Sequence, residues 1–299
     1  MTHDVIIIGG SFAGLAAAMQ LVRARRKVLV IDAAKPRNRF AHASHGFLGH
    51  DGMAPAMIRE NALRELSAYP TFARIEAEAV DAKRSDGGFS VALGDGTTQK
   101  CQRLLLAVGV KDTLPEIEGL EALWGTGVFH CPYCHGYEID GGPIGVLATS
   151  PLAHHQAALL PDWGETIVFI NPGVEFAKED RALIERRVAR IEYRQVVSVI
   201  ARGDTLTGVR LADGSTVAIK GLFVQSRVQP ASPLAERLGA SLAEGMQGPH
   251  IEVNDFGATA VPGLYAAGDA ASQMHNATLA AASGVRVAAM IHRSLIWGL

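Results

Sequence analysis

The chain is poor in the features that define several common classes of protein. Its 299 residues include only three cysteines, Cys101, Cys131 and Cys134, which is too few for the disulfide framework of a small secreted domain. No uninterrupted apolar run approaches the roughly 20 residues that cross a bilayer. The chain also opens directly on an apolar strand, without the segments of a secretion signal. These absences predict a soluble, cytoplasmic protein with no membrane partner.

Dense clusters of positive charge are also scarce. The net charge is −2, and the only dense basic clusters lie at residues 23–27 and 181–194. Each cluster falls on an expected helix, where a short run of charge is usually a solvated face. A nucleic-acid partner would require a continuous basic surface, so none is expected. Hydrophobic residues make up 48% of the chain, and its length suggests about two domains.

A glycine-rich turn stands near the start of the chain. Residues 5–8 form an apolar, β-branched run typical of a buried strand. A helical stretch (15–25) and a second strand (27–31) follow the turn, and the second strand ends in Asp32. Gly9 would form the tight turn, Gly14 would let the helix pack closely, and the helix N-terminus would receive a pyrophosphate. Asp32 has the spacing of a ribose ligand. Ser11 stands where the dinucleotide fingerprint has its middle glycine. The alternative interpretation of this stretch is a βαβ unit that binds no ligand.

The remainder of the first segment indicates further α/β structure. Residues 33–52 are loop-like and contain three histidines in no metal-ligand pattern, so these are expected to be surface or contact residues. A helix is predicted at 53–69, antiparallel strands at 73–80 and 88–93, and a further strand at 104–108. Ala107 and Gly109 would give a second, short nucleotide contact. Cys101 is expected to be an inert apolar side chain.

A second α/β pattern follows a linker at 115–120. It predicts strands at 144–148 and 166–170 and helices at 153–160 and 176–189. The turn after the first of these strands reads Ala148-Thr149-Ser150-Pro151, without the glycine that lets a backbone approach a pyrophosphate. At the end of the second strand, an acid would bind the ribose of the nucleotide or basic residues would bind its 2′-phosphate. The chain instead has Asn171-Pro172-Gly173 at this position. This domain is therefore expected to keep the fold and to have lost, or greatly weakened, nicotinamide-nucleotide binding.

The last third of the chain returns to the first pattern. Short strands are predicted at 195–200, 208–211, 216–219 and 222–224, and Pro230 and Pro233 bracket a linker. Residues 261–267 form a strand that delivers Gly268 and Asp269 to a helix at 278–296, beginning at Thr278. Asp269 would bind a polyol hydroxyl or cap the helix. The apolar tail, residues 296–299, suggests burial against a partner subunit.

The stretch Cys131-Pro132-Tyr133-Cys134-His135-Gly136-Tyr137-Glu138 is the expected centre of the chemistry. Two cysteines at this spacing can open and close a disulfide if another group supplies or removes two electrons. Thiolates carry out such exchange, and His135 is the adjacent candidate base, with Glu138 as its orienting group. No second ligand pair lies at zinc-finger spacing, so no metal is expected. A glutaredoxin-like interpretation is not favoured, because such a motif should open a helix after a strand in a small domain, whereas here it lies between a linker and a second α/β unit.

Together these motifs resemble the low-molecular-weight thioredoxin reductases over essentially the whole chain. The resemblance implies two Rossmann-like three-layer α/β domains: a discontinuous FAD domain (1–116 and 243–299) and an inserted domain (117–242) that carries the cysteine pair. It implies that Cys134 faces the flavin, that Cys131 exchanges with substrate, and that His135 replaces an aspartate acid/base. The residues implied to bind FAD are Gly9, Gly10, Ser11, Phe12, Ala13, Gly14, Asp32, Ala107, Gly109, Gly268, Asp269 and Thr278.

Two departures, the altered cysteine stretch and the missing nicotinamide fingerprint, resemble the thioredoxin-reductase-like dithiol oxidases of gliotoxin and holomycin type. That resemblance implies oxidation of a dithiol to a disulfide, with electrons passing through FAD to oxygen. It also implies a homodimer whose substrate is a small dithiol or a thioredoxin-like protein. The alternatives are an NADPH- or ferredoxin-dependent disulfide reductase and, from another class, a non-catalytic redox- or zinc-sensing module.

Overall fold

The computed structural model describes residues 2–298, which form two compact units. The first unit holds the described residues up to Arg39, then Pro55–Lys111, and the described residues from Val228 onward. The second unit holds Phe40–Ala54 and Asp112–Arg227. The strands β7 (Val110–Thr113) and β16 (Arg227–Pro230) carry the chain out of the first unit and back, and they pair with each other.

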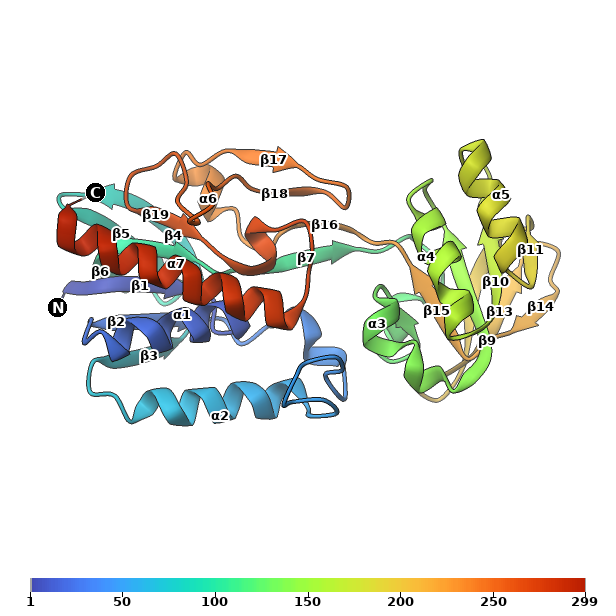
Figure 1. Cartoon of the computed structure of the whole chain (residues 1–299), viewed down its shortest axis with the longest axis horizontal. Coiled ribbons are helices and arrows are strands. Elements are labelled where there is room, and N and C mark those ends of the chain that lie inside the picture. The colour runs from blue at the N-terminus through green and yellow to red at the C-terminus, as the bar shows by residue number, and fades with distance from the viewer. Residues whose placement is uncertain (1, 299) are drawn as a thin grey trace. The chain divides into compact units, whose positions relative to one another are not determined.

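A seven-stranded sheet forms the centre of the first unit (Figure 1). The strand order is β3-β2-β1-β6-β5-β4, and β19 also pairs with β6. The strands β1, β2, β3, β6 and β19 pair in parallel, whereas β4, β5 and the first part of β6 form an antiparallel meander. The bounds are β1 (Thr2–Ile8), β2 (Val28–Asp32), β3 (Phe72–Glu76), β4 (Ala79–Ser85), β5 (Gly88–Leu93), β6 (Thr98–Leu106) and β19 (Leu264–Ala266).

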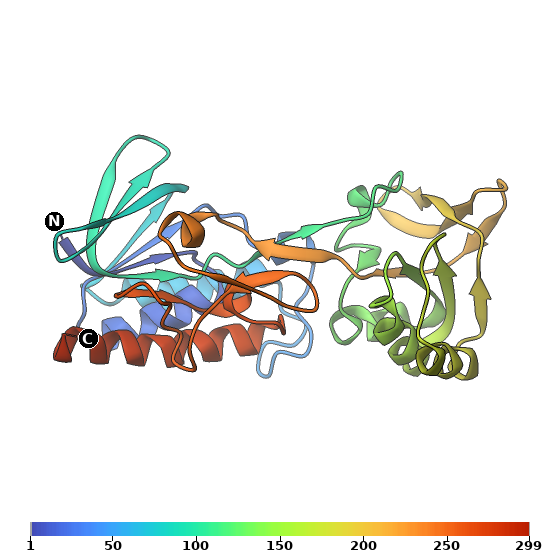
Figure 2. The ribbon, with the colours of Figure 1, turned by 90° about the horizontal axis from the view of Figure 1, so that it is seen from above.

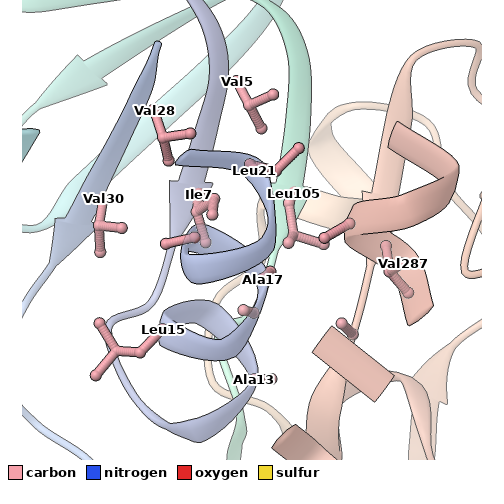
Figure 3. Packing of buried hydrophobic residues seen from close by; sticks show 14 of the residues in the cluster. Val5, Ile7, Ala13, Leu15, Ala17, Leu21, Val28, Val30, Leu105 and Val287 are labelled. Atoms are coloured by element: carbon pink, nitrogen blue, oxygen red, sulfur yellow. The ribbon is translucent and has the colours of Figure 1, made fainter. Parts of the chain in front are cut away.

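Two helices, α1 (Phe12–Arg23) and α7 (Ala277–Trp297), pack together on one face of this sheet. Figure 3 shows Val5 and Val28 from the sheet beside Leu21 of α1, with Val287 of α7 on the other side of that helix. Figure 2 shows α7 running along the sheet. The length and composition of α7 would also suit a membrane span, but its small and apolar face is buried against α1.

The remaining elements of the first unit lie around this core. They are η1 (Arg37–Phe40, whose last residue belongs to the second unit), α2 (Pro55–Ser67), α6 (Leu234–Arg237), β17 (Leu242–Glu244), β18 (Pro249–Ile251) and η5 (Gly268–Ala271). Leu234, Ala235 and Ala240 are buried in the core on the second face of the sheet.

The second unit is built on a parallel sheet in the order β11-β10-β9-β15-β8. The helices α4 and α5 contribute to the core on one face, and the small antiparallel sheet β12-β13-β14 covers the other. The bounds are η2 (Glu121–Leu123), β8 (Val128–Phe129), α3 (Pro132–His135), η3 (Tyr137–Ile139), β9 (Gly141–Ala148), α4 (Ala153–Leu159), η4 (Leu160–Asp162), β10 (Gly164–Ile170), α5 (Lys178–Arg187), β11 (Arg190–Glu192), β12 (Val196–Arg202), β13 (Thr205–Leu211), β14 (Thr216–Ala218) and β15 (Gly221–Val224).

The α/β class with Rossmann-like parallel sheets agrees with the sequence, and three details differ. Residues 73–80, predicted as one antiparallel strand, are divided between β3, which pairs in parallel with β2, and β4. Residues 228–242 belong to the first unit, because Leu234, Ala235 and Ala240 pack in its core. The loop Phe40–Ala54 belongs to the second unit, whereas the predicted boundaries placed it in the FAD domain.

Candidate functional site

The glycine turn of the first unit has the geometry of a nucleotide-binding cradle. Gly9 follows β1 with a φ of +109°, a conformation that L side chains rarely adopt. A Cβ at Gly9 would overlap the carbonyl oxygen of Ala107, and one at Gly14 would overlap that of Gly9. Ser11 begins α1 without a side-chain capping bond among the described residues, and the first turn of the helix holds no acid. The helix N-terminus therefore keeps amide donors for a pyrophosphate.

Asp32, the predicted ribose ligand, ends β2 beside this turn and is engaged by arginine. Arg59 of α2 donates from Nη2 to Oδ2 of Asp32 at 2.8 Å and from Nε to the carbonyl oxygen of Gly10 at 3.1 Å. A Cβ on Gly10 would lie 2.7 Å from Oδ2 of Asp32. Arg59 thus ties the carboxylate to the glycine turn. Sequence reasoning missed Arg59 because nothing in the helical pattern of residues 53–69 distinguishes it from a basic residue on the solvent-exposed face.

Segments far apart in the sequence meet at the same edge of the sheet. The amide of Ala107 donates to Ile8 at 2.8 Å, and that of Ala267 donates to Leu106 at 3.0 Å. The amide of Gly268 donates to Oγ of Ser283 at 2.7 Å. The carboxyl ends of parallel strands are where α/β sheets bind nucleotides. The predicted residues Ala107, Gly109, Gly268 and Asp269 all follow strands that end at this edge.

Thr278 contributes to this region through its backbone. It lies in the first turn of α7, and its amide donates to Oδ1 of Asn276 at 2.8 Å, so Asn276 is the helix cap. The glycine turn, the uncapped N-terminus of α1 and the converging strand ends together fit a dinucleotide such as FAD.

Cys131 and Cys134 form a disulfide in the second unit, with Cα atoms 5.3 Å apart. Cys131 occupies the N-cap position of α3, a four-residue helix that begins shortly after β8. The motif does open a helix after a strand, contrary to the expectation from sequence. The strand is two residues long at the edge of a five-stranded sheet, so the setting remains the α/β unit rather than a small glutaredoxin-like domain.

His135 is the last residue of α3 and is largely enclosed. Its ring stacks on Phe129 of β8 with centroids 4.2 Å apart, and its Nδ1 is shielded from solvent without a hydrogen-bond partner among the described residues. Burial lowers the pKa of His135 to about 4, and the charge of His45 adds to the decrease, while a hydrogen bond to the Cys131 backbone opposes it. The ring is therefore neutral at pH 7.

Glu138, predicted to orient His135, instead contacts a histidine from another segment. Its Oε1 lies 3.4 Å from Nδ1 of His45, and Oδ1 of Asp51 lies 3.7 Å from the same nitrogen. Sequence reasoning treated His42, His45 and His50 alike as loop residues. No local signal separates them, because only the fold brings His45 to Glu138.

The second nucleotide turn lacks a phosphate cradle. Residues 149–152 link β9 to α4, a helix of seven residues, and the linker contains no glycine. A cavity of about 310 Å³ lies at the end of β10, and its lining includes residues 170–176 and Arg181. The guanidinium of Arg181 donates to Oε1 of Glu185 at 2.9 Å and to the hydroxyl of Tyr193 at 3.0 Å. The guanidinium is therefore already engaged by two side chains of the protein.

The other predicted chemistry-bearing residues lie apart from these sites. Cys101 is buried in β6, and burial raises the pKa of its thiol to about 12, so it is not a thiolate at neutral pH. Among residues 2–298, no three side chains of His, Cys, Asp or Glu are grouped to hold a metal ion.

The fold agrees with comparisons to known proteins. Residues 3–284 match the pyridine nucleotide-disulphide oxidoreductase family. The chain is 33% identical to a thioredoxin reductase, tcpT, of Claviceps purpurea (strain 20.1), over 94% of this chain and 90% of the relative.

Two solved structures are also similar. One is an oxidoreductase from Agrobacterium tumefaciens, with 45% identity, a TM-score of 0.95 and full coverage of both chains. The other is HlmI, with 36% identity, a TM-score of 0.91 and coverage of 99% of this chain and 93% of that one. The chain belongs to the pyridine nucleotide-disulphide oxidoreductase family, and it is a flavoprotein enzyme of the thioredoxin-reductase-like type that binds FAD and acts on thiols and disulfides.

Proposed function

We propose that this enzyme oxidises a substrate dithiol to a disulfide through the Cys131–Cys134 pair and passes the electrons by way of FAD to dioxygen. The observation that carries the proposal is the closed cysteine pair at the start of α3, in a unit whose nucleotide turn has lost its glycines. In its closed form the pair is the disulfide that a dithiol substrate would attack. An NADPH-driven reductase would instead need a phosphate cradle after β9.

The exchange runs in two substitution steps at sulfur. A substrate thiolate attacks Sγ of Cys131, the bridge breaks, and Cys134 leaves as a thiolate. The second substrate thiolate then attacks the substrate sulfur of the mixed disulfide, so that the product disulfide forms and Cys131 is released. The chemistry that bound FAD supplies is the acceptance of the two electrons of the reduced pair, with dioxygen as the proposed final acceptor.

His135 is proposed to act on the cysteine that leaves rather than as a strong base. A free thiol has a pKa of about 8.5, and the pKa of His135 is about 4. Complete proton transfer between them would cost on the order of 6 kcal/mol. A thiolate formed at Cys134 would favour the protonated ring, so the basicity of His135 rises only as the bridge opens. In this scheme the neutral ring donates a hydrogen bond to that thiolate.

We also propose a small dithiol or a thioredoxin-like protein as the substrate, a homodimer as the assembly and the cytoplasm as the location. The Claviceps purpurea relative, which is named a thioredoxin reductase, supports the sulfur substrate. Exposed Ile296 and Trp297 at the end of α7 support a covering partner subunit, because exposed apolar side chains at a terminus are unfavourable in water. Leu299, the last residue of that tail, lies outside the described residues.

A cysteine substitution tests the proposal. Cys131→Ser should lower oxygen-coupled oxidation of dithiothreitol by a factor on the order of 10³ or more, because the attacked sulfur is gone. The variant should remain yellow, since the residues of the FAD cradle are unchanged. Cys101→Ala is the matched control and should keep turnover near that of the wild type. Full activity in Cys131→Ser would refute the scheme.

A further inference from the structure

An ion pair of two nearly buried side chains lies against the glycine turn of the first unit. Asp32 ends β2 and Arg59 belongs to α2, and their side chains are 10% and 13% exposed. Removing two charges from water costs free energy that their mutual attraction often fails to repay, so such a pair is weak evidence for stability. Its place beside the expected phosphate site points instead to a role in binding.

The guanidinium of Arg59 holds Asp32 in one orientation. Its Nη2 donates to Oδ2 of the carboxylate at 2.8 Å, while its Nε donates to the carbonyl oxygen of Gly10 at 3.1 Å. A planar guanidinium with two such acceptors is fixed in position and direction. Leu66 of the same helix is buried in the core that also contains Ala13 of α1. The helix that carries Arg59 is therefore fixed to the same core as the start of α1.

Arg59 leaves the second carboxylate oxygen of Asp32 available. Among residues 2–298, no group donates a hydrogen bond to Oδ1 of Asp32. Asp32 is the residue expected to accept a hydrogen bond from the ribose of the adenosine half of FAD. The arginine thus occupies one oxygen of the carboxylate, and the other remains for the ribose hydroxyl.

A second arginine, Arg74 of β3, lies farther from this carboxylate. Its Nη2 is 3.9 Å from Oδ2 of Asp32 and 2.7 Å from Oε2 of Glu76, to which it donates a hydrogen bond. The charge of Arg74 is therefore engaged mainly by Glu76. Arg59 is the residue that directly compensates the charge of Asp32.

The charge of Asp32 matters because of what the glycine turn is expected to bind. A Cβ on Gly10 would lie 2.7 Å from Oδ2 of Asp32, so the carboxylate lies against the turn that is expected to receive the pyrophosphate of FAD. The pyrophosphate is negatively charged, and a nearly buried charge is poorly screened by solvent and salt. Without Arg59, the carboxylate would repel the group that the turn is built to bind.

We propose that Arg59 is a positioning residue for FAD. It holds Asp32 with Oδ1 directed to the ribose hydroxyl, and it cancels the carboxylate charge that would otherwise oppose the pyrophosphate. Arg59 acts through Asp32 rather than as a ligand of its own. The inference goes beyond the proposed function, because it concerns the binding of the cofactor and holds whichever way the electrons flow.

A double-mutant cycle tests whether Arg59 acts through Asp32. The dissociation constant of FAD is measured by equilibrium dialysis of the full-length wild type, Arg59→Met, Asp32→Asn and the double variant. Arg59→Met should weaken FAD binding by about 100-fold, because it leaves the carboxylate both unsupported and uncompensated. Asp32→Asn should weaken it by about tenfold, because a neutral amide accepts a weaker hydrogen bond from the ribose. The double variant should bind FAD about tenfold more tightly than Arg59→Met, because the orphaned charge is gone.

Two further variants and a stability measurement serve as controls. Arg64→Met removes an exposed arginine from the same helix and should leave FAD binding unchanged. Arg59→Lys keeps the charge but cannot reproduce the two directed bonds of the guanidinium, so its loss should be intermediate. Thermal unfolding of the flavin-free proteins reports folding separately from FAD binding. A purely structural role of Arg59 would lower the unfolding temperature without any recovery of FAD affinity in the double variant.

The decisive result is the order of FAD affinities within the cycle. A double variant that binds FAD no more tightly than Arg59→Met would overturn the proposal, since Arg59 would then act independently of Asp32. An unchanged affinity in Arg59→Met would overturn it as well. If Arg59→Met does not fold, Asp32→Asn is compared with the double variant. Equal FAD affinities would support action through Asp32, and a large further loss in the double variant would contradict it.

Discussion

At the scale of single residues, the surroundings of His135 decide its chemistry. Its ring stacks on Phe129 and has an enclosed Nδ1, and burial together with His45 lowers its pKa to about 4 from the usual 6.5. The residue type alone suggested a base working near neutral pH. The enclosure makes it instead a group that is neutral at pH 7.

The depressed pKa of His135 predicts a specific loss of stability in acid. The folded state stays unprotonated down to about pH 4, whereas the unfolded state takes up a proton below pH 6.5. Stability from this residue is therefore complete above pH 6.5 and is lost as the pH falls towards 4. Between pH 7 and pH 4.5, wild type should lose on the order of 2 kcal/mol more than His135→Gln.

Urea unfolding followed by tryptophan fluorescence measures this difference, because Trp124 and Trp163 both lie in the second unit. For each protein, the free energy of unfolding at pH 4.5 is compared with its own value at pH 7. A constant difference in stability between wild type and His135→Gln therefore cancels. Equal losses in the two proteins would show that His135 is not enclosed as described.

The sequence predicted the residues whose role depends on local spacing and missed those whose role depends on the fold. The Cys131–Cys134 pair and the turn at Gly9 and Gly14 follow from spacing. The contacts from Arg59 to Asp32 and from His45 to Glu138 join separate segments. Neither contact has a motif, so residue type could not distinguish these side chains from their neighbours.

At the scale of elements, the close packing of α1 on α7 holds the N-terminus of α1 at the nucleotide edge. A Cβ on Gly284 of α7 would overlap the backbone carbonyl of Ala13, and one on Gly268 would lie 2.8 Å from Cβ of Ala13. The two helices therefore approach at small residues, and the beginning of α1 cannot move without a change in this contact.

Gly284→Ala should weaken both stability and FAD binding. The added methyl group has no space and must separate the helices, at a cost of about 1–3 kcal/mol. The shift displaces the amides at the start of α1 that are expected to receive the pyrophosphate. Thermal unfolding and FAD retention during gel filtration measure the two effects. The exposed Ala282 of the same helix is the control as Ala282→Ser, which should change neither; unchanged values for Gly284→Ala would contradict the packing.

Strand positions could be predicted well, and strand partners less well. The alternation of residues 73–80 continues across the boundary between β3 and β4, so the pattern alone concealed a change from parallel to antiparallel pairing. The short α3 was not expected as a helix, because four residues are too few to show helical periodicity.

At the scale of the whole molecule, the chain divides into two units that the sequence largely anticipated. The return to the first unit occurs at Val228, ahead of the predicted boundary at 243, since Pro230 and Pro233 resemble a linker although the residues after them are buried. The sequence also identified which unit lacks a phosphate cradle, because the absence of glycine after β9 is visible without a fold.

The central claim is that thiols, and not a nicotinamide nucleotide, feed electrons to this flavoprotein. The most direct test is anaerobic stopped-flow reduction of the flavin by dithiothreitol and by NADPH, compared on the same preparation. The account predicts rapid bleaching by dithiothreitol through Cys131 and Cys134, and little or none by NADPH at micromolar concentration. Rapid bleaching by micromolar NADPH, with dithiothreitol ineffective, would contradict it.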